Sequence, residues 1–143
     1  MLVRLLYASR AAKTVDQDAL HAILKQCKAN NPAQGITGVL ALCSTGNVFM
    51  QALEGGRAQV NRLYNRIAAD PRHSDVTLLS YDEIDERMFA GWSMGQVNMS
   101  RLNTALVLKY SETAALDPFA VSGRVCLALF NELLATASIV GQS

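Results

Sequence analysis

Gln51 places an amide on an otherwise apolar strand face, which makes it the first candidate for chemistry in this chain. Alternate residues of an extended strand share a face, so Gln51 lies with Phe49 and Leu53. An amide can donate and accept at once, and burying it without partners costs about 1–3 kcal/mol. We therefore expect Gln51 to be hydrogen-bonded, either to another part of the protein or to a bound ligand.

Tyr7 carries the second candidate group. A strand predicted over residues 2–9 presents Val3, Leu5 and Tyr7 on one face. A buried tyrosine needs a partner for its hydroxyl. That partner is backbone in an ordinary core and a functional group in a site, and the strand by itself leaves both interpretations open.

Two adjacent asparagines end the first predicted helix. Thr14-Val15-Asp16-Gln17 resembles a capping box, and residues at helical spacing follow it: Leu20, Ile23, Leu24 and Cys27. We expect the helix to stop near Asn30-Asn31-Pro32, since the residue before a proline avoids the α region. The two amides serve either as capping and turn groups or as contacts to the edge of a ligand.

A polar cluster ends the second predicted helix, which covers residues 58–69. The cluster contains Arg66, Asp70, Arg72 and His73. Basic side chains at a helix C-terminus complement the helix dipole, which would make this a solvated helix end. Arginine forks also suit phosphates and a carboxylate suits sugar hydroxyls, so the cluster is equally a candidate site for a phosphate or a ribose.

The elements that must position these groups follow the order βαββαββ. Apolar alternation and turn signals predict strands over residues 2–9, 36–43, 49–55, 76–81 and 91–97. Trp92 and Met94 would share one face of the last strand. The first four strands and two helices match the ferredoxin-like pattern, and connection rules place both helices on one face of the sheet. We therefore predict an α+β fold in which Tyr7 and Gln51 face the two helices.

A helical extension follows the sheet region. It is predicted to contain a short helix over residues 102–110 and a longer one over residues 117–136, with Asp117-Pro118 as its N-cap and first position. The long helix is apolar nearly all round, so it must be buried, either over the exposed sheet face or in a subunit interface. We divide the chain into residues 1–98 and an extension, residues 99–143, that forms a cap or an oligomer interface.

Composition excludes several classes of protein. A net charge of +1 argues against a dedicated nucleic-acid binder, which normally carries a basic stripe. The three cysteines are far apart and fit neither a disulfide framework nor a zinc site. No signal-peptide core and no apolar run of membrane-spanning length occurs. We therefore expect a cytoplasmic protein that binds neither membrane nor nucleic acid.

Several short motifs occur together in a specific order and spacing. They are Tyr7, Asn31, Gly35-Ile36-Thr37-Gly38, Phe49-Met50-Gln51-Ala52-Leu53-Glu54-Gly55, Asp70-Pro71-Arg72-His73 and Phe89-Ala90-Gly91-Trp92-Ser93-Met94. Over about residues 2–97 the chain resembles the BLUF family, the flavin-binding domains that sense blue light. The helical extension resembles that of the short, single-domain members, which act through partner proteins.

The resemblance implies a flavin that lies between the two helices, over the sheet. FAD is the expected cofactor, although FMN or riboflavin could occupy the same ring site. The residues implied to bind it are Ile23 and Ile67 around the ring, Asn30 and Asn31 at its polar edge, Arg66, Asp70 and His73 toward the ribityl and phosphate end, and Gln51 between the flavin and Tyr7.

The resemblance also implies a photoreceptor that is not an enzyme. A phenol can give an electron and a proton to an excited flavin, and Gln51 could then rotate or tautomerise, which exchanges its donor and acceptor ends. A hydrogen bond gained at the flavin carbonyl edge would shift absorption to longer wavelength. The implied photoactive residues are Tyr7, Gln51, Trp92 and Met94. The signal would pass through the fifth strand and the C-terminal helices to a downstream signalling protein, and the apolar long helix favours a homo-oligomer.

Two positions depart from the family pattern. The turn around residues 44–47 is slightly longer than in some relatives, which should leave Gln51 on its face. Cys27 stands where relatives often carry a small hydroxyl residue. A thiol is a weak donor, so we expect one contact to the flavin to be weakened.

Two other classes of function fit the residues less well. The chain could be a non-photoactive ferredoxin-like module that binds another small ligand, which would make the protein colourless. An acylphosphatase-like enzyme would need an arginine in a phosphate-cradling loop, with an asparagine close by. Arg10 and Asn31 are the candidates for these roles, but no glycine-rich loop surrounds Arg10. Nucleophilic catalysis lacks triad partners for His21 and His73.

Overall fold

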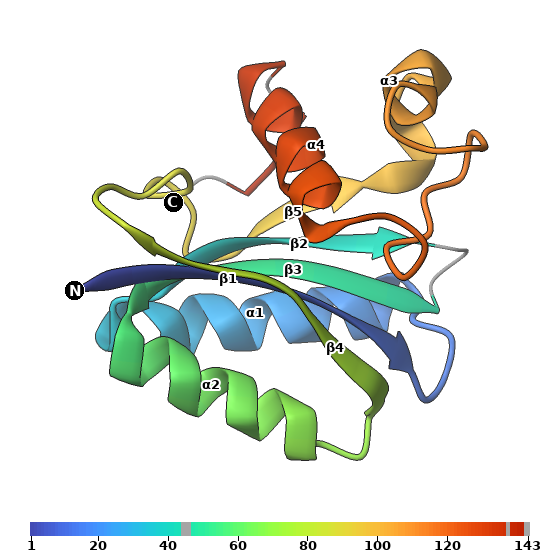
Figure 1. Ribbon diagram of the computed structural model, residues 1–143. Helices are drawn as coiled ribbons and strands as arrows, with labels where there is room; N and C mark the ends of the chain where they lie inside the picture. Colours follow the sequence, from blue (N-terminus) through green and yellow to red (C-terminus); the bar gives the residue numbers. More distant parts are fainter. Residues whose placement is uncertain (44–46, 137, 142–143) are drawn as a thin grey trace.

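The computed structural model contains one five-stranded sheet in the order β4-β1-β3-β2-β5, with helices on both of its faces (Figure 1). It describes residues 1–43, 47–136 and 138–141, so the turn predicted around residues 44–47 lies mostly outside the described part. The strands are β1 Leu2–Ala11, β2 Thr37–Cys43, β3 Val48–Gly56, β4 His73–Ile84 and β5 Gly95–Asn98. The helices are α1 Gln17–Gln34, α2 Arg57–Ala69, η2 Met99–Arg101, α3 Thr104–Leu108 and α4 Gly123–Ala135.

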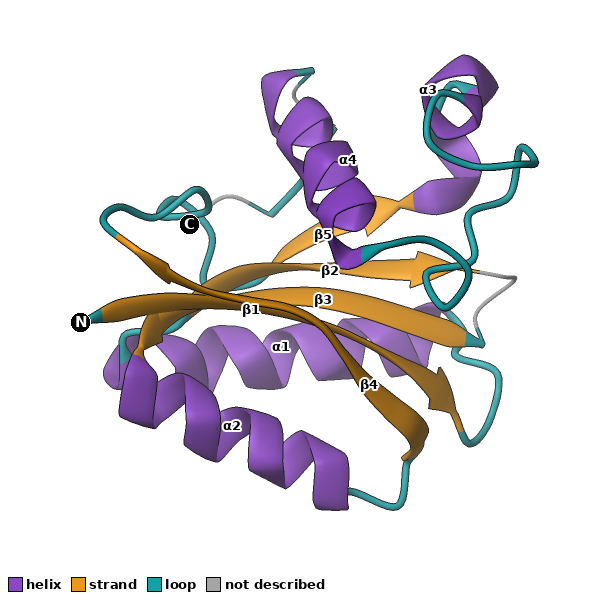
Figure 2. Ribbon diagram, viewed as in Figure 1, coloured by secondary structure: helices purple, strands orange, loops and turns teal. Residues whose placement is uncertain are grey.

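The helices α1 and α2 lie on one face of the sheet, and α3 and α4 lie on the other (Figures 1 and 2). All neighbouring strands are antiparallel except β2 and β5, which are parallel. The predicted α+β, ferredoxin-like arrangement with both helices on one face is confirmed.

Strand alternation divides the core into two apolar clusters, one on each face of the sheet. The lower cluster packs β1 and β3 against α1 and α2, and its buried members include Val3, Leu5, Tyr7, Phe49 and Leu53. The upper cluster packs the other strand faces against the extension, and it includes Leu6, Met50, Ala52, Leu129 and Phe130. Tyr7 and Gln51 therefore face the helices, as the period-two pattern predicts.

The predicted ends of α1 are both wrong. Asp16 is the N-cap and accepts from the Ala19 backbone N–H. The helix then runs through Pro32 to Gln34 and ends at Gly35, whose φ of 67° allows the closing turn. Proline removes one backbone donor, but here it lies in the last turn, so the helix continues past it and carries Asn31 within the helix.

The predicted fifth strand is shorter than expected. Only residues 95–98 pair with β2, and residues 91–94 form turns and bends before them. Backbone carbonyls in this segment bond outward instead: Trp92 O accepts from Gly38 N at 3.0 Å. Residues 88 and 89 form bends, and Glu54 accepts hydrogen bonds from the backbone N–H groups of both.

The long C-terminal helix begins later than predicted. Asp117 caps only a local turn, by accepting from the Phe119 N–H, and Ser122 is the N-cap of α4. At Gly123 the helix meets β4 so closely that a Cβ would lie 1.9 Å from the Leu79 carbonyl oxygen. The apolar side of α4 is buried against the upper face of the sheet, which was one of the two locations left open by the sequence.

Candidate functional site

Tyr7 and Gln51 form a direct cross-strand pair at the centre of the lower sheet face. They are register partners in the antiparallel β1–β3 ladder. The Tyr7 hydroxyl donates to Gln51 Oε1 at 2.5 Å, and both side chains are buried, with relative exposures of 1% and 5%. The register of two paired strands therefore sets this contact, and the Gln51 side-chain oxygen accepts its hydrogen bond from the Tyr7 phenol.

The donor end of Gln51 points to the loop before β5. Gln51 Nε2 donates to Met94 Sδ at 3.2 Å, and Met94 is buried in the lower cluster. Asn31 reaches the same loop from α1, where its Nδ2 donates to the Ser93 carbonyl at 2.6 Å. The structure thus brings four predicted motifs together: Tyr7 on β1, Gln51 on β3, Asn31 on α1 and Met94 after the loop.

Tyr7 lies between α1 and α2. Burial raises the pKa of its phenol well above the ordinary value, and the nearby Cys27 and Tyr64 add to the rise. The Tyr64 ring on α2 is tilted by 56° with its centroid 5.7 Å from that of Tyr7. The phenol therefore stays protonated at working pH. The sequence did not predict this contact, although Tyr64 lies three residues before Ile67 and so shares its side of α2.

The side chains predicted to surround a planar ring lie on facing helices. Ile23 on α1 and Ile67 on α2 are half-buried and pack against the lower cluster. Asn30, by contrast, is exposed on α1, one position away from the buried Asn31. Adjacent helical residues point in directions about 100° apart, since a turn has 3.6 residues, so Asn30 and Asn31 do not share an environment.

The polar cluster after α2 is paired within itself. Arg72 Nη2 donates to Asp70 Oδ2 at 2.6 Å, and its Nε contacts both carboxylate oxygens at 3.0–3.1 Å. These bonds lower the pKa of Asp70 to about 2. His73 lies deeper, where Nδ1 is 2.9 Å from Ser9 Oγ and the ring is 5.3 Å from that of Phe49.

Arg66 lies one helical turn before this pair, in the last turn of α2, and it is exposed. The cluster therefore places the exposed Arg66 guanidinium and the Asp70–Arg72 ion pair on the surface, with the half-buried His73 imidazole behind them. This is the arrangement of groups that the sequence placed at the end of the helix.

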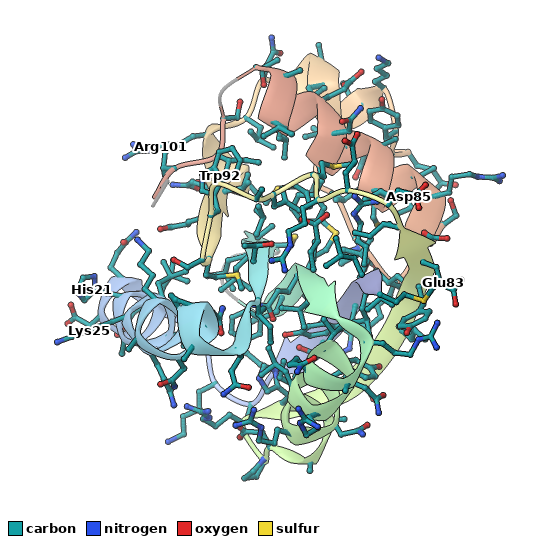
Figure 3. The ribbon with its side chains drawn as sticks, turned by 90° about the vertical axis from the view of Figure 1, so that its left-hand side faces the viewer. His21, Lys25, Glu83, Asp85, Trp92 and Arg101 are labelled. Atoms are coloured by element: carbon teal, nitrogen blue, oxygen red, sulfur yellow. The ribbon has the colours of Figure 1, made fainter. Side chains whose placement is uncertain are left out.

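Trp92 lies on the opposite side of the sheet from Met94, so the prediction that they share a strand face is wrong. Trp92 packs against the upper cluster, while Met94 belongs to the lower one. In Figure 3, Trp92 lies nearer to α4 than to α1, whereas His21 and Lys25 project outward from α1. The two residues separate because the chain crosses between the clusters at residues 92–94 and is not extended there. Among the described residues, the buried Trp92 Nε1 has no hydrogen-bond partner.

Glu54 is a buried acidic residue that sequence reasoning missed as a functional group. It is fully buried on the upper face of β3, where it binds Arg4 and two backbone amides of the loop after β4. A signal was present, because Glu54 shares a strand face with the apolar Met50 and Ala52. A carboxylate is rarely buried unless it is paired.

A cavity of about 430 Å³ lies at the other edge of the sheet, between the start of α1, β5 and the extension. Its walls carry amides and hydroxyls such as those of Gln17, Asn98 and Thr104, and none of the residues predicted to bind a ligand line it. The described residues contain no cluster that could hold a metal ion. None of the described helices is long and apolar enough to span a membrane.

Comparison with known proteins assigns the family. The family model described as "BLUF: Sensors of blue-light using FAD" matches residues 2–95. The beta subunit of the photoactivated adenylate cyclase of Euglena gracilis is 35% identical over 104 residues, which are 72% of this chain and 12% of that protein. The chain thus spans only a small part of the length of such cyclase relatives.

Solved structures agree over almost the whole chain. The photo-activated state of BlsA superposes with a TM-score of 0.81 at 32% identity, covering 100% of this chain and 99% of that one. The dark-state structure of the BLUF protein BlrB gives a TM-score of 0.78 at 30% identity, covering 95% and 96% of the two chains. The fold and the family match together place the chain among the flavin-based blue-light sensors. The chain belongs to the BLUF family, and its BLUF region is a photosensor module.

The residues at the site fit a flavin. Gln51 Nε2 donates to a thioether sulfur, which is a weak acceptor, so a ring nitrogen or carbonyl would satisfy this buried donor better. Ile23 and Ile67 leave apolar surface partly exposed on the two helices that face the Tyr7–Gln51 pair. A planar aromatic ring between the helices would cover that surface and reach the amide.

Proposed function

We propose that the protein senses blue light through a hydrogen-bond rearrangement of Gln51 that is triggered by transfer of an electron and a proton from Tyr7. The observation that supports this most is the continuous series of contacts from the Tyr7 hydroxyl through the Gln51 amide to Met94. A bound flavin would supply the light absorption and the acceptor for the electron and the proton. Tyr7 is suited to donate, since its phenol is buried and protonated.

Gln51 acts as the residue that changes. Its Oε1 accepts from Tyr7, so departure of the phenolic proton removes the bond that holds the amide in its starting orientation. Rotation or tautomerisation then exchanges the donor and acceptor ends of the amide, and the contact between Nε2 and Met94 Sδ is lost. A hydrogen bond that the rearranged amide gained at the carbonyl edge of a bound flavin would shift absorption to longer wavelength.

The cofactor is FAD in this proposal, although FMN or riboflavin would occupy the same ring site. Ile23 and Ile67 hold the ring, and the buried Asn31 binds its polar edge, whereas Asn30 is exposed on another side of α1. Arg66 and the Asp70–Arg72 pair face the phosphate end, and His73 closes the ribityl side. The exposed guanidiniums of Arg66 and Arg72 support this assignment, because they can attract a phosphate. Asp70 opposes it little, because a carboxylate paired with Arg72 repels a phosphate less than a free one.

The output route runs through β5 to the extension and then to a partner protein. Gln96 on β5 exchanges two backbone hydrogen bonds with Val140, at 2.9 and 3.0 Å. Ile139 is buried, and its Cγ2 would be 2.7 Å from a Cβ at Gly95. Movement of Met94 therefore reaches the segment after α4 through adjacent residues. Trp92 contributes to this route through a change in its packing against the upper cluster. Its buried Nε1 lacks a hydrogen-bond partner among the described residues.

Absorption spectra before and after blue light test the proposal. Purified protein should contain flavin and show a reversible red shift. Tyr7→Phe should keep the flavin and abolish the shift, because the ring remains and the transferable proton is removed. Tyr64→Phe, 5.7 Å away by ring centroids, is the matched control and should keep the shift.

A normal photocycle in Tyr7→Phe would contradict the role of the phenol. Bound flavin without any reversible shift in the natural sequence would instead leave a ligand-binding module that is not photoactive.

A further inference from the structure

Glu54 is a buried carboxylate on the same strand as Gln51, but on the opposite face of the sheet. Its Oε2 accepts from Arg4 Nε and from the Met88 backbone N–H, each at 2.8 Å. Its Oε1 accepts from the Phe89 backbone N–H at 2.7 Å. Hydrogen bonds to an ionised acceptor are roughly twice as strong as neutral ones, so Glu54 is a firm anchor for the loop after β4.

The anchor is a row of three residues across three strands. Glu54 is the register partner of Arg4 on β1 and of Thr37 on β2. Thr37 Oγ1 accepts from Arg87 Nη1 at 3.1 Å. Three consecutive loop residues, 87–89, are therefore held by one transverse row of the sheet.

The anchored loop leads directly to the photoactive site and to α4. Further along, Ser93 is bonded to Asn31 and Met94 to Gln51. The Phe89 ring meets the Phe130 ring of α4 edge-on, with centroids 6.0 Å apart. Phe89 thus connects the Glu54 anchor to α4, and the same loop carries Met94 five residues further along.

We propose that Glu54 is a positioning residue for the light reaction: it holds residues 87–94 so that Met94 Sδ meets Gln51 Nε2. This inference rests on the proposed function. Because Glu54 and Gln51 lie on the same strand, β3 fixes the position of the loop relative to the Gln51 amide. Loosening Glu54 withdraws the sulfur acceptor, and the dark orientation of Gln51 then loses the contact that favours its return.

Thermal recovery after illumination is the measurement. Glu54→Gln keeps the size of the side chain but turns an amide donor toward backbone donors. It should slow recovery by about fivefold or more with the red shift intact, and a change of that size corresponds to a modest rise in the barrier. In a Met94→Ala background the same substitution should change the rate by less than about twofold, since residues acting through one contact are not additive.

The controls separate positioning from folding. Glu54→Asp keeps a charge beside Arg4 but shortens its reach to the loop amides, so it should slow recovery in the same way even if Glu54→Gln does not fold. Glu112→Gln, an exposed acid in the extension, should leave recovery unchanged. An equal slowing in both the natural and Met94→Ala backgrounds, or no slowing at all, would overturn the proposal.

The methyl NMR signal of Met94 in the dark gives a test that needs no photochemistry. It should move in both Glu54 variants and not in Glu112→Gln. If the natural sequence shows no red shift, the proposed light reaction fails, while this signal still decides whether Glu54 positions Met94. An unmoved Met94 signal would overturn the inference by itself.

Discussion

At the scale of single residues, burial and pairing set the charge of the polar cluster after α2. Burial lowers the pKa of His73, opposed by the nearby Asp70 charge and aided by Arg72. The Arg72 hydrogen bonds hold the pKa of Asp70 at about 2. Above about pH 4, therefore, the Asp70–Arg72 pair keeps its charges, and His73 is the group in this cluster whose pKa lies below its ordinary value of 6.5.

This predicts a stability that depends on pH through His73. Its folded pKa is below the unfolded value of 6.5, so the unfolded state binds more protons and stability falls as pH drops through that value. Urea unfolding between about pH 7.5 and pH 5.5 should show a smaller loss for His73→Gln than for the natural sequence. An equal loss in both would show that His73 does not contribute.

At the scale of elements, the local sequence pattern predicted which helices and strands form, but it misplaced the ends of α1 and the start of α4. Period-two alternation was enough to place Tyr7 and Gln51 on the same face. Pro32 was taken as a stop although tertiary packing carries α1 past it, and residues 91–94 were taken as strand although their carbonyls bond Gly38 and Asn31. The role of Glu54 was missed because its partners come from the distant β1 and from a loop.

The pairing of Val140 with β5 gives a prediction at this scale. Val140→Pro removes the N–H that donates to the Gln96 carbonyl, whereas Val140→Ala keeps it and changes only an exposed side chain. In the dark, the Gln96 amide should exchange slowly in Val140→Ala and quickly in Val140→Pro. Light should speed exchange in the alanine variant alone. Slow dark exchange in the proline variant, or no effect of light, would contradict the output route.

At the scale of the whole molecule, the extension completes the core of the sheet. The buried residues of α4 are Cys126, Leu129, Phe130 and Leu133, and all of them pack in the upper cluster. The division at residue 98 stays a prediction, as does the homo-oligomer. The apolar side of α4 no longer supports an oligomer by itself, because the sheet already covers it.

Leu129 provides the test. Leu129→Ala should lower the free energy of unfolding by about 2–5 kcal/mol, as for other buried leucines. Asn131→Ala, at an exposed position of the same helix, should change it by about 0.5 kcal/mol or less. Denaturant unfolding measures both, and light scattering on the same samples gives the number of subunits. A Leu129 effect as small as that of Asn131 would show that the extension does not stabilise the sheet.

The Tyr7–Gln51 pair and the Met94 contact differ in how they are supported. The first is set by the register of two central strands, and the second by a loop. A contact held by a strand ladder changes little with temperature or solvent viscosity, whereas a loop must rearrange its backbone to re-form its contact. In the proposed photocycle, formation of the red-shifted state should persist in cold or viscous solution, while the return to the dark state slows steeply. The protein would then retain its record of light for longer in the cold.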